Sequence, residues 1–178
     1  MSLLEGAIQR YQQYKLNKRR DKHMDGFEEL LRDFLPKDYS LKKHKVILED
    51  SRYRKKRWDY TIVRELDNEP IGIIELKSLH KSANKNINNR QEEAVGCAEF
   101  AQKKIPSVKR SYLLVGVCLE DRAIQMWKDF LDDCLKYEWY HSVCLIIMDE
   151  DGNWSTPKGM SVADMMRPYK EFSEEKEQ

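Results

Sequence analysis

The feature that most constrains this chain is a pair of apolar, β-type runs joined by a short turn. The first run is WDYTIV, from Trp58 to Val63, and the second is IGIIELKS, from Ile71 to Ser78. The intervening segment 66–70 reads LDNEP, and Asp, Asn and Pro are typical of a tight turn. The two runs are therefore predicted to form an antiparallel hairpin within a largely buried sheet.

Three charged residues interrupt this apolar hairpin. Glu75 and Lys77 are two apart, so their side chains project to the same face of a strand. A hairpin folded about residues 66–70 is predicted to place Asp59 opposite Lys77, and Thr61 opposite Glu75. The two acids and the lysine would then converge, and burial of such a cluster is costly unless its members form ion pairs or bind a cation.

This cluster is suited to metal-assisted hydrolysis of a phosphodiester. Two carboxylates at one point fit a hard divalent cation such as Mg²⁺, which takes oxygen ligands and keeps several waters. A neighbouring lysine can orient or deprotonate the attacking water and can stabilise negative charge that develops on a phosphate. The spacing alone also fits a pair of structural salt bridges at the end of a strand.

The residues that follow the hairpin make the pattern more specific. Trp58-Asp59 is followed by ELKS at 75–78 and by NNRQEEAVG at 88–96. In this order the segments resemble the XhoI-like type II restriction endonucleases, a branch of the PD-(D/E)XK nuclease superfamily. The resemblance covers residues 58–96, with a weaker similarity in 24–35. It implies that Asp59 and Glu75 are metal ligands and that Lys77 is the catalytic lysine.

The resemblance also implies a fold and an activity. The expected fold is α/β, with a PD-(D/E)XK core in which a central mixed β-sheet is flanked by helices. The expected activity is hydrolysis of double-stranded DNA at a specific site, supported by Mg²⁺ or Mn²⁺, through direct attack of water. Cleavage of both strands of a symmetric site favours a homodimer, and a cognate DNA methyltransferase is an implied partner. The alternatives are a related repair or phage nuclease with loose specificity, and a non-catalytic DNA-binding or protein-interaction domain with the same fold.

Further residues are candidates for the site. Glu29, near the start of a helix expected around 25–35, and Glu93 are additional candidate acids, although the helix dipole also favours glutamates in a first turn. Asn89 is alternatively the N-cap of a helix, with Glu92 as its capping-box partner. DNA contacts are expected from a basic run that ends before Asp59, from the residue after Lys77 and from a helix N-terminus, namely Arg57, Ser78, Asn88, Asn89 and Arg90.

The rest of the chain alternates between helical and strand patterns, as expected of one α/β domain. Small residues at 94–101 predict close packing of a helix on the sheet. Residues 1–170 are assigned to a single nuclease domain, and 171–178 to an acidic, disordered tail. The expected helices are 3–18, 90–104, 122–139 and 160–172, and the expected strands are 46–49, 111–120, 142–150 and an edge strand at Trp154.

Composition adds limits on location and partners. The net charge is +1, but the last eight residues hold four glutamates and one lysine, so residues 1–170 carry about +4. The sequence holds neither a run of about 18 apolar residues nor a recognisable secretory leader, which predicts a cytoplasmic protein without a membrane partner. The four cysteines lack CxxC spacing and are expected to be small core residues in a reducing compartment.

Overall fold

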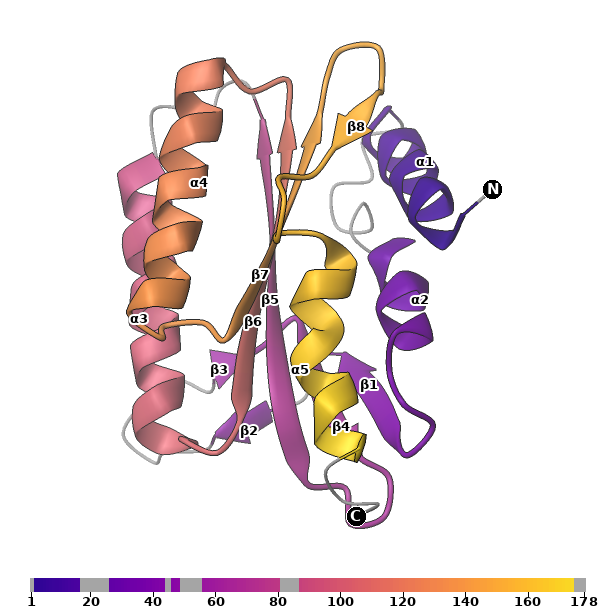
Figure 1. The fold of residues 1–178 in the computed structure, drawn as a ribbon, viewed down its shortest axis with the longest axis vertical. Helices are drawn as coiled ribbons and strands as arrows, with labels where there is room; N and C mark the ends of the chain where they lie inside the picture. The colour runs from indigo at the N-terminus through magenta and orange to yellow at the C-terminus, as the bar shows by residue number, and fades with distance from the viewer. Residues whose placement is uncertain (1, 17–25, 44–45, 49–55, 81–86, 175–178) are drawn as a thin grey trace.

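A six-stranded mixed β-sheet forms the centre of the protein, with helices on both of its faces (Figure 1). The computed structural model describes residues 2–16, 26–43, 46–48, 56–80 and 87–174. In spatial order the strands are β1 (Tyr39–Lys43), β4 (Tyr60–Arg64), β5 (Pro70–His80), β6 (Lys109–Val117), β7 (Ser142–Met148) and β8 (Trp154–Ser155). The β5–β6 and β6–β7 pairs are parallel, and the other pairs are antiparallel. The expected α/β class and mixed sheet are thus confirmed.

Two helical layers cover the sheet (Figure 1). One layer holds α1 (Leu3–Leu16), α2 (Gly26–Asp33) and α5 (Val162–Glu174), and the other holds α3 (Ile87–Lys104) and α4 (Asp121–Lys136). Successive residues of β6 enter different cores: Leu113 packs with the first layer, and Leu114 with the second. A central parallel strand is buried on both faces, which explains the unbroken apolar runs in β6 and β7.

The β4–β5 hairpin forms as predicted, but its register differs by two residues. Tyr60 lies opposite Ile74 and Thr61 lies opposite Ile73, so the predicted pairing of Thr61 with Glu75 is wrong. The loop closes earlier than expected because the backbone N–H of Arg64 donates to the carbonyl of Glu69 at 2.9 Å. A bulge after Ile62 changes the register by one residue in the opposite direction, which leaves a net shift of two. Because side chains alternate with a period of two, a two-residue shift keeps the same residues on the same face.

Several smaller elements differ from the expectations. Strand β1 was not predicted, because the alternation in its sequence YSLKK extends only from Tyr39 to Leu41. The predicted strand near 46–49 exists as β2 (Val46–Leu48), but it pairs with β3 (Lys56–Arg57) in a separate two-stranded sheet. Helix α5 runs through Glu174, so the first four residues of the expected tail are helical, and 175–178 lie outside the described residues. The edge strand at Trp154 is confirmed.

Helix α3 packs on the sheet through alanines. Ala94, Ala98 and Ala101 are buried, as the small-residue pattern predicted. The same expectation is wrong for Gly96, which is exposed, and a Cβ added there would meet nothing within 4 Å. The helix begins at Ile87, three residues earlier than expected, because the buried Ile87 side chain holds its first turn against the core.

The turn after α4 is held by a buried arginine. Glu138 has a φ of 56°, in the left-handed region, which ends the helical path before Trp139. The Arg110 side chain donates to the carbonyl of Trp139 at 2.9 Å and to that of Glu138 at 3.0 Å. The backbone N–H of Arg110 donates to Nδ1 of His141 at 3.1 Å. Burial, together with the charges of Arg110 and Lys109, lowers the pKa of His141 from 6.5 to about 4.

Acidification is therefore expected to destabilise the protein through His141. The unfolded chain gains a proton on this residue near its ordinary pKa, and the folded chain only near pH 4, so stability falls between these values. We expect a loss on the order of 1 kcal/mol, reduced by the partial exposure of the ring. Urea unfolding at pH 7 and pH 5 measures this loss. A His141→Asn variant keeps an acceptor but cannot titrate, and an equal loss in that variant would contradict the assignment.

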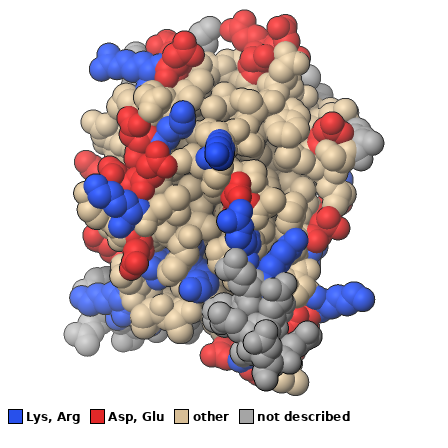
Figure 2. Space-filling model, in the orientation of Figure 1, with Lys and Arg blue, Asp and Glu red and all other residues tan. Residues whose placement is uncertain are grey.

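The surface in Figure 2 carries both signs of charge over the helices, with acidic side chains gathered at the β7–β8 turn. Asp149, Glu150 and Asp151 are exposed in this turn. Negative charge there disfavours contact with phosphates. None of the helices within the described ranges has the length and apolar character needed to span a lipid bilayer. The four cysteines are free thiols; Cys134 and Cys144 are buried as expected, and Cys97 and Cys118 are only partly buried.

Candidate active site

The middle of β5 carries an ion pair on the sheet face that α3 covers. Glu75 and Lys77 lie on this face between Ile73 and Leu79. The side chains of these two apolar residues pack in clusters that include alanines of α3. Lys77 Nζ lies 2.8 Å from Glu75 Oε1. The Glu75 side chain is 4% exposed and that of Lys77 is 22% exposed, so the lysine lies between the buried acid and the surface.

Asp59 lies beside this pair because the backbone of β5 binds its carboxylate. Its Oδ2 accepts a hydrogen bond of 2.7 Å from the N–H of Leu76. The last ladder pair of the hairpin on this side is Tyr60 with Ile74, and extending it by one residue brings Asp59 opposite Glu75. The structure thus brings together the three predicted residues, although Asp59 neighbours Glu75 and not Lys77 in the register.

A third carboxylate reaches Lys77 from α3. Glu93 Oε1 lies 3.5 Å from Lys77 Nζ, and its Oε2 lies 2.9 Å from Arg90 Nη1, one turn earlier on the helix. Charges of opposite sign therefore alternate from β5 to α3 through Glu75, Lys77, Glu93 and Arg90. Glu93, one of the two additional candidate acids, belongs to the cluster.

The cluster keeps its lysine charged. Burial opposes the charge on Lys77, but Glu75, followed by Glu93 and Asp59, outweighs this effect, and the pKa of Lys77 is raised above its ordinary value. Burial also opposes the charge on Glu93, and Lys77 and Arg90 together lower the pKa of that carboxyl. At neutral pH the site therefore holds an ammonium group between carboxylates.

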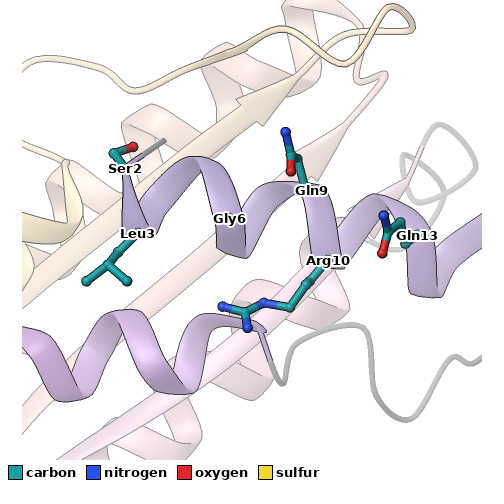
Figure 3. Close-up of a pocket in the computed structure, with 6 residues that line it drawn as sticks. All are labelled: Ser2, Leu3, Gly6, Gln9, Arg10 and Gln13. Carbon is teal, nitrogen blue, oxygen red and sulfur yellow. The ribbon is translucent and has the colours of Figure 1, made fainter.

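Glu29, the other additional candidate, lies in the opposite helical layer. It ion-pairs with Arg10 of α1, with 2.7 Å between Arg10 Nη2 and Glu29 Oε2. Figure 3 shows Arg10 pointing from α1 towards the neighbouring helix, beside a groove. The groove is lined by Ser2, Leu3, Gly6, Gln9, Arg10 and Gln13. It lacks a carboxylate, so its lining does not suit a cation, and Glu29 is engaged outside the Lys77 cluster.

The expected DNA-contacting residues fall in different places. Asn88, Asn89 and Arg90 are exposed in the first turn of α3, which contains no acidic residue. Asn89 lies inside the helix, so its alternative role as an N-cap is wrong. The hydroxyl of Ser78 forms a hydrogen bond with that of Tyr11 in α1, on the sheet face away from Lys77. The side chain of Arg57 lies outside the described residues.

Sequence reasoning missed one residue beside the cluster. Tyr112 of β6 lies opposite Glu75 in the parallel ladder and is fully buried. A tyrosine within the apolar run SYLLVGV reads as an ordinary core residue. The signal available in the sequence was its phenol, which with Ser111 is one of two polar side chains in that run.

Comparison of the chain with protein-family models, with curated proteins and with solved structures finds no match. The chemistry of the site is therefore inferred from the side chains that meet at Lys77 and from the resemblance carried by residues 58–96.

Proposed function

We propose that this protein is a Mg²⁺-dependent type II restriction endonuclease with a PD-(D/E)XK core, which hydrolyses double-stranded DNA at a specific site. The observation that carries the proposal is the meeting of Asp59, Glu75 and Lys77 on one face of the sheet. These are the residues to which the XhoI-like resemblance gives catalytic roles. The six-stranded mixed sheet with helices on both faces is compatible with the proposed core.

The donor set fits a hard divalent cation. Asp59, just before β4, and Glu75, on the adjacent strand β5, offer carboxylate oxygens, and oxygen ligands are those that Mg²⁺ and Mn²⁺ accept. The buried Glu75 side chain already faces a positive group in this structure, the ammonium of Lys77. When bound, such an ion activates water and stabilises charge on the phosphate.

The chain's own residues have separate tasks in this proposal. Lys77, which is charged and partly exposed, orients the attacking water and stabilises negative charge on the phosphate. Glu93 holds the Lys77 ammonium from the side of α3. The exposed first turn of α3, with Asn88, Asn89 and Arg90, and the basic run ending at Arg57 contact DNA phosphates and base edges. Ser78 instead joins β5 to α1 through Tyr11.

The proposal extends to partners. A symmetric DNA site that is cut in both strands is most simply cleaved by a homodimer, because each subunit then supplies one set of catalytic residues. A DNA methyltransferase that modifies the same site would protect the host DNA.

Incubation of phage and plasmid DNA with the protein tests this function. We expect discrete fragments with Mg²⁺ or Mn²⁺ and none with EDTA. A metal-dependent smear would contradict site specificity and favour a nuclease of loose specificity. Intact DNA with both metals, from protein shown to be folded, would contradict the nuclease and leave the ion pairs of Lys77 as structural contacts in a non-catalytic domain.

A further inference from the structure

Tyr112 lies beside Glu75, on the neighbouring strand β6. In the parallel β5–β6 ladder it is the direct partner of Glu75, so both side chains project to the face covered by α3 and α4. The centre of the Tyr112 ring lies 5.1 Å from that of Tyr140, so the two rings pack against each other. The residue is 0% exposed.

The hydroxyl of Tyr112 differs from those of the other buried tyrosines around the sheet. Tyr140 donates to the carbonyl of Ala94 at 3.0 Å, and Tyr169 shares a hydrogen bond of 2.7 Å with Ser111. The Tyr112 hydroxyl is buried and has no hydrogen-bond partner within the described part of the chain. Buried hydroxyls are nearly always paired, because an unpaired one loses its bonds to water without replacement.

The Tyr112 hydroxyl is surrounded by apolar groups and by nearby acidic side chains. Burial raises the pKa of Tyr112 well above its ordinary value, and the negative charge of Glu75 raises it further, followed by Cys134 and Glu93. The phenol O–H is a hydrogen-bond donor, and its side chain projects to the same face of the sheet as that of Glu75. A carboxylate that binds a metal ion usually accepts a hydrogen bond from a second residue, which fixes its orientation.

We propose that Tyr112 is a positioning residue for Glu75, and that its hydroxyl donates a hydrogen bond to the Glu75 carboxylate when this group leaves Lys77 to bind a divalent cation. The inference rests on the proposed function, because that function calls for the cation. It assigns to the buried phenol a partner that is present only in the metal-bound protein.

The Tyr112→Phe variant tests the inference in two measurements on the full chain. Mn²⁺ affinity, measured by titration calorimetry, is expected to fall by about 10-fold or more, as is usual when the hydrogen-bond partner of a ligating carboxylate is removed. The melting temperature in EDTA is expected to stay the same or to rise, because the Tyr112 hydroxyl makes no hydrogen bond to the described residues of the metal-free protein.

Tyr140→Phe is the matched control, since it removes the same atom from the neighbouring ring. It breaks the bond to Ala94, so its melting temperature in EDTA is expected to fall by about 2–4 °C while its Mn²⁺ affinity stays unchanged. The two variants should thus show opposite patterns in the two measurements.

Three results would overturn the inference, and they are distinguishable. Equal Mn²⁺ affinity of Tyr112→Phe and the parent would remove Tyr112 from the site and leave the nuclease intact. A loss of stability in EDTA like that of Tyr140→Phe would show that the hydroxyl has an ordinary structural partner. A folded parent protein that neither binds Mn²⁺ nor cleaves DNA would overturn both the inference and the proposed function.

Discussion

Replacing Glu75 by glutamine is expected to lower the rate of Mg²⁺-dependent DNA cleavage by at least about 10²–10³-fold, the usual cost of removing one group that stabilises the transition-state charge. Glutamine has the same shape but loses the negative charge that would hold a divalent cation. Its carbonyl oxygen can still accept from Lys77, which also keeps its ion pair with Glu93. The fold is therefore expected to survive, and cleavage rates can be compared at matched concentrations of folded protein.

Glu69→Gln makes the same chemical change in the same hairpin. Glu69 is exposed and ion-pairs with Arg64 at the loop, where it touches none of the cluster residues. We expect this variant to cleave DNA at the parent rate, because an exposed ion pair contributes little to stability. Equal activity of Glu75→Gln and Glu69→Gln would show that Glu75 is not a metal ligand.

Replacing Gly72 by alanine is expected to destabilise the protein by about 3 kcal/mol. A Cβ at this position would lie 2.3 Å from Cε1 and 2.9 Å from Cζ of the Tyr169 ring. The ring cannot withdraw freely, because Tyr169 is buried and its hydroxyl is tied to Ser111, which in turn is bonded to Ser142. Relief of the clash therefore requires α5 or β5 to move. Urea unfolding at constant pH measures the change.

Gly96→Ala is the matched control for the glycine substitution. Gly96 lies inside α3 and is open to solvent, so the new methyl group meets no neighbour. Alanine is the better helix former, and the variant is expected to be more stable than the parent by about 0.5–1 kcal/mol. A shift of the same sign in both variants would mean that the contact with Tyr169 does not determine the outcome at Gly72.

The period of two along a strand made much of the site predictable. It placed Asp59, Glu75 and Lys77 on one face even though the predicted register was two residues off. The same rule puts Ser78 on the other face from Lys77, where its hydroxyl meets that of Tyr11. The register itself depends on the hydrogen bond from Arg64 to Glu69 and on a bulge, and the composition of the loop specifies neither.

Contacts between distant segments were the least predictable. Tyr112 meets Glu75 because β6 pairs with β5 in parallel after the chain has passed through α3, and nothing local to SYLLVGV encodes that register. Glu93 was a candidate acid by resemblance, but its contact with Lys77 comes from the packing of α3 on the sheet. Glu29 was also a candidate acid, but it lies on α2, in the helical layer on the opposite face of the sheet.

The hydrogen bond between Asp59 and Leu76 also bears on how the sheet avoids pairing with other molecules. Within the described strands, β4 pairs with β5 only as far as Ile74, while β5 continues to His80. An exposed strand edge with unpaired N–H groups is a template for association with another chain. The Asp59 carboxylate accepts from the N–H of Leu76, just beyond that last pair, and places negative charge beside β5. A substitution at Asp59 would therefore affect the solubility of the protein as well as its proposed chemistry.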